Sequence, residues 1–119
     1  MDWSRFVGQN NAVSEQVRRE LRTLQELRAY AQIYAHLIDA ITQLRHHGQA
    51  ITIDEGGRHI FVAGPMRTIG IHRDKTRHIV RVSGPGRFDP QEFAIPETED
   101  GLEAWSLSVV KAAVEILMA

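Results

Sequence analysis

Apolar side chains recur at helical spacing near the start of the chain. Residues 12–47 contain neither Gly nor Pro, and Asn11 or Ser14 is suited to cap the start of a helix. Gly48, directly after two histidines, is typical of the residue that follows a helix. The pattern therefore predicts a helix over residues 12–47, with apolar positions at Val17, Leu21, Leu24, Ala31, Ile38 and Ile41.

The predicted helix is longer than the domain that would hold it. Residues 12–47 would span about 54 Å at about 1.5 Å per residue, whereas a compact domain of 119 residues is roughly 35 Å across. An overhanging half with a narrow apolar stripe needs a partner, and the simplest one is the same helix of a second copy. We therefore expect a homodimer, unless a kink folds residues 12–28 back as a separate helix. The expected dimerisation residues are Val17, Leu21 and Leu24.

Residues 51–62 alternate in a way that predicts a β-hairpin. Gly56-Gly57 separates two alternating segments and is a strong signal for a two-residue turn. Pairing outward from this turn joins Glu55 with Arg58, Ile53 with Ile60, and Ile51 with Val62. One face of the hairpin is then apolar, and the other face holds Thr52, Asp54, His59 and Phe61.

Residues 67–82 predict a second hairpin with Asp74-Lys75 at its tip, although a loop over residues 73–76 fits as well. Both alternatives join His72 with Arg77, Ile71 with His78, and Ile69 with Val80. They place the same apolar residues toward the core, namely Ile69, Ile71, Val80 and Val82. The outward residues are then Thr68, His72, Arg77 and Arg81, with Arg73 and Lys75 at the tip.

The remaining chain completes a single α+β domain over residues 1–119. The segment 84–97 is rich in Pro and Gly, so we expect a loop, in which 91–95 is a candidate for a short edge strand limited by the flanking prolines. Residues 98–118 predict a second helix with an apolar face. The expected fold is a long N-terminal helix, a four-stranded antiparallel β-meander over residues 50–83, and a C-terminal helix packed on one sheet face.

Composition excludes several classes of protein. The 43% hydrophobic content is ordinary for a globular domain, and zero cysteines exclude disulfides and thiolate metal sites. No run of about 18 apolar residues predicts a membrane span, and the first residues show no secretory signal, so we expect a cytoplasmic protein that does not contact membranes.

The net charge of −1 is unevenly distributed along the chain. Six basic and five acidic residues give residues 1–50 a charge of +1, and seven and three give residues 51–88 a charge of +4. One basic and seven acidic residues give residues 89–119 a charge of −6. The basic middle and the acidic end either neutralise each other in the fold or face different partners.

No catalytic motif is present, and we expect no catalytic residue, metal or cofactor. There is no Walker-type phosphate loop, no GxGxxG, no GxSxG and no HExxH. Asp54, His59 and His72 share one predicted sheet face and are the residues on which an enzyme or metal alternative would depend. Arg77, predicted opposite His72, would repel a cation there.

The second hairpin is the predicted partner-binding face, through His72, Arg73, Lys75, Arg77 and Arg81. Arginine makes bidentate contacts to carboxylates, so we expect another protein with an acidic surface as the partner. Nucleic acid is the alternative, with Arg87 as a further phosphate contact, but only Phe61 and Phe88 supply aromatic rings. The sequence therefore predicts a non-catalytic, homodimeric protein-binding module of the inhibitor, immunity, adaptor or secretion-chaperone kind.

Overall fold

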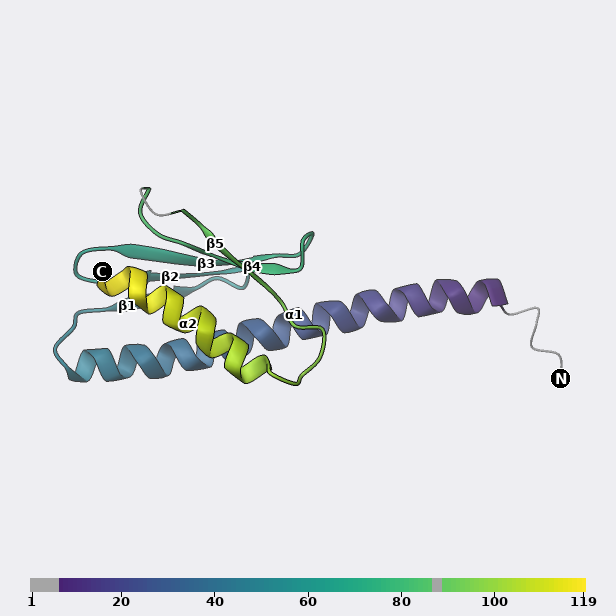
Figure 1. Cartoon of the computed structure of the whole chain (residues 1–119), viewed down its shortest axis with the longest axis horizontal. Coiled ribbons are helices and arrows are strands. Elements are labelled where there is room, and N and C mark those ends of the chain that lie inside the picture. The colour runs from purple at the N-terminus through teal and green to yellow at the C-terminus, as the bar shows by residue number, and fades with distance from the viewer. Residues whose placement is uncertain (1–6, 87–88) are drawn as a thin grey trace.

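The protein consists of two helices and an antiparallel sheet, and the helices lie on the same side of the sheet (Figure 1). The computed structural model describes residues 7–86 and 89–119; Arg87 and Phe88 lie outside the described residues. In chain order the elements are α1 (Val7–His46), β1 (Thr52–Glu55), β2 (His59–Ala63), β3 (Thr68–Asp74), β4 (Ile79–Ser83), β5 (Gln91–Ala94) and α2 (Leu102–Met118). The predicted α+β class, the helix at each end and the antiparallel meander are confirmed.

The sheet has five strands in the order β1-β2-β3-β4-β5, where four were predicted. The fifth strand is the short edge candidate: Gln91 pairs with Val82, and Phe93 pairs with Val80. Pro90 and Pro96 lie just outside β5, so neither removes an N–H group from its ladder with β4. The prolines limit the length of this edge strand but do not prevent it.

Helix α1 runs without interruption from Val7, earlier than the predicted start, so neither Asn11 nor Ser14 is its cap. The alternative, a kink that folds residues 12–28 back as a separate helix, is therefore not present. The molecule measures 69 × 27 × 22 Å, and the N-terminal half of α1 projects well past the sheet (Figure 1). Every side chain of residues 14–24 is exposed, and Gln25 is the first buried residue among those whose burial is described. The predicted overhang is present.

The core lies between the sheet and the two helices. The C-terminal half of α1 contributes Ala29, Tyr30, Ile33, Leu37 and Ile41. The sheet contributes Ile60, Val62, Ile69, Ile71, Val80 and Val82, as the strand alternation predicts. Helix α2 starts at Leu102, later than predicted, because Gly101 takes a left-handed conformation (φ 76°) just before it. Its buried apolar residues are Leu102, Val109, Val110, Ala113, Ile116 and Leu117.

The first hairpin has a longer loop than predicted, and the loop of the second lies two residues later than the predicted four-residue alternative over residues 73–76. In the first, Glu55 pairs with Ile60 and not with Arg58, so the loop comprises residues 56–59. The Glu55 carboxylate accepts a hydrogen bond from the backbone N–H of Gly57, whose φ of 87° favours glycine. The register moves by two residues, and an even shift leaves every side chain on its predicted face. In the next pair of strands, β2 and β3, His59 lies directly opposite His72.

In the second hairpin Asp74 pairs with Ile79, and the loop comprises residues 75–78. The Oδ1 atom of Asp74 accepts hydrogen bonds from the backbone N–H groups of Thr76 (3.0 Å) and Arg77 (3.2 Å). His78 closes the loop in the left-handed region (φ 53°). Asp74 therefore organises a wider turn than Asp74-Lys75 alone, and Ile71 lies opposite Val82 instead of His78.

Candidate functional site

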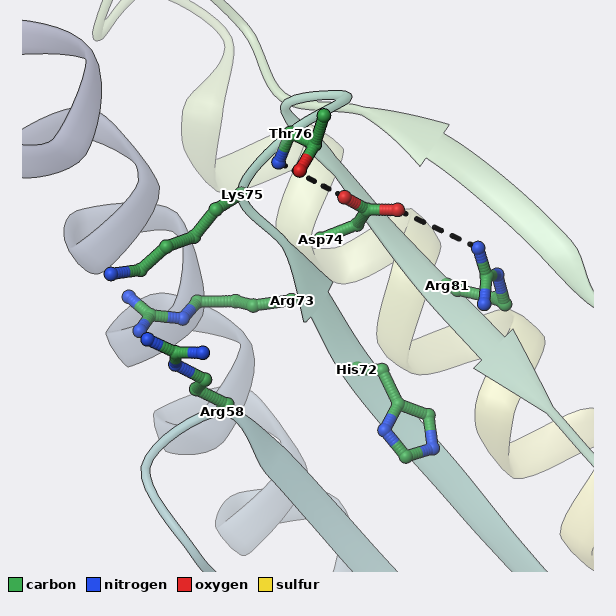
Figure 2. A pocket seen from close by; sticks show the side chains of 7 residues that line it. All are labelled: Arg58, His72, Arg73, Asp74, Lys75, Thr76 and Arg81. Atoms are coloured by element: carbon green, nitrogen blue, oxygen red, sulfur yellow. Dashed lines mark hydrogen bonds and ion pairs between the residues drawn. The ribbon is translucent and has the colours of Figure 1, made fainter. Parts of the chain in front are cut away.

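The predicted partner-binding residues lie on both sides of β3 (Figure 2). His72 and Arg81 pair across the ladder and occupy the sheet face that no helix covers. Arg73, Lys75 and also Arg58 extend from the other side, and their charged ends gather beside α1. The sequence predicts one outward surface on this hairpin, whereas the structure divides its residues into two groups.

On the open face, acidic neighbours already neutralise the arginines. Arg77 forms a bidentate pair with Glu92 of β5, and both N···O distances are 2.7 Å. Arg81 lies 3.6 Å from Asp74 and 3.8 Å from Glu92. Arg77 was predicted to lie opposite His72 and to repel a cation there. The observed register places Arg81 opposite His72 instead. The fifth strand thus brings an acidic residue to the basic hairpin.

Arg73 was predicted to lie at the tip of the hairpin. It is buried instead, with only 7% of its side chain exposed. Because the loop begins after Asp74, Arg73 still belongs to β3 and shares the face of Ile69 and Ile71. Its Nε atom lies 3.6 Å from Oε1 of Glu26 on α1, and its guanidinium lies 5.4 Å from the centre of the Tyr30 ring. Arg73 is therefore a contact between sheet and helix.

Glu26, Arg73 and His78 form a buried ionic cluster at the point where α1 leaves the sheet. The Oε2 atom of Glu26 lies 3.9 Å from Nδ1 of His78, and only 4% of the Glu26 side chain is exposed. Burial lowers the pKa of His78 and nearby Arg22 adds to this effect, while the Glu26 carboxylate opposes it. His78 is buried as well, and its Nδ1 atom has no hydrogen-bond partner among the described residues.

A second polar link joins α1 to the first hairpin. The Tyr30 hydroxyl donates to Glu55 at 2.8 Å and lies 2.9 Å from the carbonyl oxygen of His59. Burial raises the pKa of Tyr30, and the hydrogen bond to Glu55 raises it further. The same bond lowers the pKa of Glu55. The predicted pairing of Glu55 with Arg58 is thus replaced by contacts to Tyr30 and Gly57.

Three rings gather on the open sheet face. The His59 and Phe61 ring centres are 4.7 Å apart, and His72 lies 6.2 Å from His59 and 5.6 Å from Phe61. Burial lowers the pKa of His72, and His59 and Arg81 lower it further. Asp54 pairs with Phe61 and not with His59. Among the described residues, no group of three His, Cys, Asp or Glu side chains is placed to hold a metal ion.

The predicted dimerisation residues lie on the projecting half of α1. Their exposed fractions are 45% for Val17, 59% for Leu21 and 43% for Leu24. Leu27, at 46%, lies beside them. At about 100° per residue, Val17 lies about 160° around the helix axis from Ile33, which is fully buried against the sheet. This apolar stripe therefore faces away from the core.

Two residues of the site were missed in the sequence analysis. Glu26 precedes Tyr30, Ile33 and Leu37 at spacings of four, three and four residues, so it lies on the buried side of the helix. A charged residue at such a position indicates a buried residue of opposite charge that pairs with it. Arg58 was assigned to an ion pair with Glu55, and only the corrected loop directs it toward Arg73. The backbone N–H of Arg73 donates to the Arg58 carbonyl at 2.8 Å.

No family model, no curated protein and no solved structure shows a significant match to the chain. Within the part of the chain that the structure describes, no helix is both long and apolar enough to cross a membrane.

Proposed function

We propose that the protein is a non-catalytic protein-binding module that acts as a homodimer. The observation that carries this proposal is the apolar stripe of Val17, Leu21 and Leu24 on the projecting half of α1. The part of α1 that precedes Gln25 is about 27 Å long at about 1.5 Å per residue, and residues 14–24 bury no side chain in their own chain. Most of the stability of a helix in a protein comes from the packing of its apolar face, and this segment has no such packing within its own chain.

The occupant that fits this stripe is a second copy of α1. Val17, Leu21 and Leu24 recur at spacings of four and three residues, which is the seam of a two-helix coiled coil. The same line continues onto the body of the protein through exposed Ala31 and Ala35, whose small side chains permit close approach of a helix. Arg28, which falls on this line, is paired with Glu99 of its own chain. A pair of helices thus buries the leucines of both copies.

Replacing the stripe tests the dimer. We expect Leu21→Glu/Leu24→Glu to give the mass of one chain by sedimentation equilibrium at micromolar concentration, where the wild type gives two. Leu107→Glu is the matched control, because Leu107 of α2 is 47% exposed outside the stripe, and its mass is expected to equal that of the wild type. A wild type of one chain, or a double variant that stays dimeric, contradicts the proposal.

The partner surface in this proposal is the basic hairpin β3–β4, which meets an acidic protein surface. Lys75 at its tip is exposed and forms no ion pair among the described residues. Arg81 is 37% exposed, and its distances of 3.6 and 3.8 Å to its acidic neighbours leave it able to exchange partners. The module would then act in the manner of an inhibitor, an immunity protein, an adaptor or a secretion chaperone.

Charge reversal at the tip tests this surface. We expect Lys75→Glu/Arg81→Glu to lose an acidic partner that co-purifies from the native host with the wild type. Lys111→Glu, on α2, is the control because Lys111 is the other lysine of the chain, and it should keep the partner. Retention of every partner by the hairpin variant would show that the surface is assigned wrongly.

Nucleic acid is the second candidate, favoured by the rings of His59, Phe61 and His72 beside Arg81 on the open face. Flat aromatic groups next to an arginine suit the stacking of unpaired bases. If this candidate is correct, a single-stranded oligonucleotide binds with an affinity that falls linearly with salt on logarithmic scales, and Phe61→Ala weakens binding. Absence of binding at low salt would exclude it.

A further inference from the structure

A cavity of about 410 Å³ lies at the tips of the two hairpins. Its lining consists of Arg58, His72, Arg73, Asp74, Lys75 and Thr76, together with Arg81. Figure 2 shows that the ends of Arg58, Arg73 and Lys75 converge on the side of α1, although they come from a loop, a strand and a turn. Gathering three cations is unfavourable unless something anionic lies among them.

Arg73 supplies the strongest indication of what is missing from this cluster. Its side chain is 93% buried, yet its Nε and Nη1 atoms have no hydrogen-bond partner among the described residues. The Glu26 carboxylate is 3.6 Å from Nε, which is beyond hydrogen-bond range. Oε1 of Glu26 lacks a hydrogen-bond partner as well. A buried guanidinium that donates no hydrogen bond from these atoms is costly, and a further acceptor beside it would reduce that cost.

The charges around the cavity define the acceptor. Glu26 neutralises one of the three converging cations, and Asp74 pairs with Arg81, so two positive charges remain uncompensated. A carboxylate brings one negative charge, whereas a phosphate monoester carries about −1.5 to −2 at pH 7. Phosphate also offers three terminal oxygens, which suit the fork of Arg73 and the separate directions of Arg58 and Lys75.

We infer that this cavity is a binding site for a phosphate monoester, held by Arg58, Arg73 and Lys75. The inference does not depend on dimerisation, because all three residues come from one chain and none belongs to the stripe of α1. It extends the proposed function by assigning a ligand to the cavity at the hairpin tips, which shares Lys75 with the proposed partner surface.

Titration of the full-length protein with inorganic phosphate, followed by amide chemical shifts, tests the site. We expect saturable shifts in residues 58 and 73–76 with a dissociation constant of about 1 mM or lower. Sodium chloride at the same ionic strength should not reproduce them. Arg58→Ala and Lys75→Ala are each expected to weaken binding about tenfold, whereas Lys111→Ala, the matched lysine control, leaves the affinity unchanged. These variants remove exposed side chains, so folding is not at risk.

Several outcomes would overturn the inference. Shifts that do not saturate by about 20 mM phosphate would do so, as would equal weakening by Lys111→Ala. Acetate that binds as tightly as phosphate would show that the site recognises any single negative charge and is not a phosphate site. Phosphoserine and a nucleoside monophosphate then identify the source of the phosphate, and tighter binding of either supports the site. The Leu21→Glu/Leu24→Glu variant should still bind phosphate, which separates this inference from the dimer.

Discussion

The two halves of α1 differ in which side chains are buried and which are exposed. In the C-terminal half even a charged side chain, Glu26, is buried, and it faces the sheet together with Tyr30 and Ile33. In the N-terminal half even leucines are exposed, and Leu21 reaches 59%. Both halves belong to one unbroken helix, so the difference comes from what surrounds them and not from local structure.

The comparison teaches that an apolar stripe alone does not locate a core. The stripe that continues through Ile33, Leu37 and Ile41 is covered by the sheet, and the stripe of Val17, Leu21 and Leu24 points away from it. A helix that changes its apolar face along its length has two packing partners. The first partner lies within the chain, and the proposed second partner is another copy.

The largest expected effect comes from removing the buried charge. We expect Glu26→Ala to lower the free energy of unfolding by about 3–5 kcal/mol, because it leaves the buried Arg73 guanidinium without its counter-charge. Glu20→Ala, in the projecting half, is the matched control and should cost less than about 0.5 kcal/mol, since Glu20 is exposed. Urea unfolding measures both, and equal losses would show that the two halves do not differ as described.

Replacing one leucine in each half by alanine compares how much the packing of that leucine contributes to stability. Leu37→Ala is expected to cost about 2–5 kcal/mol at any protein concentration, because Leu37 is fully buried in its own chain. The cost of Leu24→Ala should rise with protein concentration, because its contacts are made with a second copy. Thermal unfolding of both variants across a range of concentrations distinguishes them. A concentration-independent loss at Leu24 contradicts the proposed role of the stripe.

The pH dependence of stability is a smaller effect. It depends on His78, which lies beside Glu26 at the junction of the two halves, and on His72, which lies on the open sheet face. Burial lowers the pKa of both His72 and His78 in the folded protein, whereas unfolded histidine titrates near pH 6.5. The unfolded state therefore binds protons first as the pH falls, so stability is lost from about pH 6.5 downward.

For His78, Arg22 acts in the same direction as burial, while Glu26 and Glu97 reduce the shift. For His72, His59 and Arg81 act with burial. We expect His72→Gln/His78→Gln to show a smaller loss of stability between pH 7.5 and 5.5 than the wild type in urea unfolding. His46→Gln/His47→Gln, at the exposed end of α1, should retain the loss of the wild type. An unchanged loss in the first variant would contradict the assignment.

The faces of the strands were predictable from sequence, but their partners were not. Alternation placed Ile69, Ile71, Val80 and Val82 in the core, and all four are buried. The registers were wrong because Glu55 and Asp74 accept hydrogen bonds from loop N–H groups. The first loop is therefore longer than predicted, and the second lies two residues later than the four-residue alternative. Side-chain bonds of this kind depend on rotamers that a pattern of apolar positions does not contain.

The candidate site was predictable only in part, because its charges are compensated by distant residues. Arg77 is matched by Glu92 of a strand that the sequence offered only as a candidate, and Arg73 is matched by Glu26 across the core. The position of Arg73 did follow from the alternation with Ile69 and Ile71, once the loop was known to start after Asp74. The exposed stripe of α1 was predicted correctly, because a helix longer than its domain leaves no cover for it.

Hydrogen exchange in the projecting half of α1 tests the central claim most directly. If a second copy stabilises this half, amides of residues 14–24 exchange slowly at high protein concentration and much faster on dilution, while amides around Ile33 remain protected at both. The Leu21→Glu/Leu24→Glu variant should show fast exchange in residues 14–24 at every concentration. Exchange in this segment that is equally fast at high and low concentration in the wild type would contradict the claim.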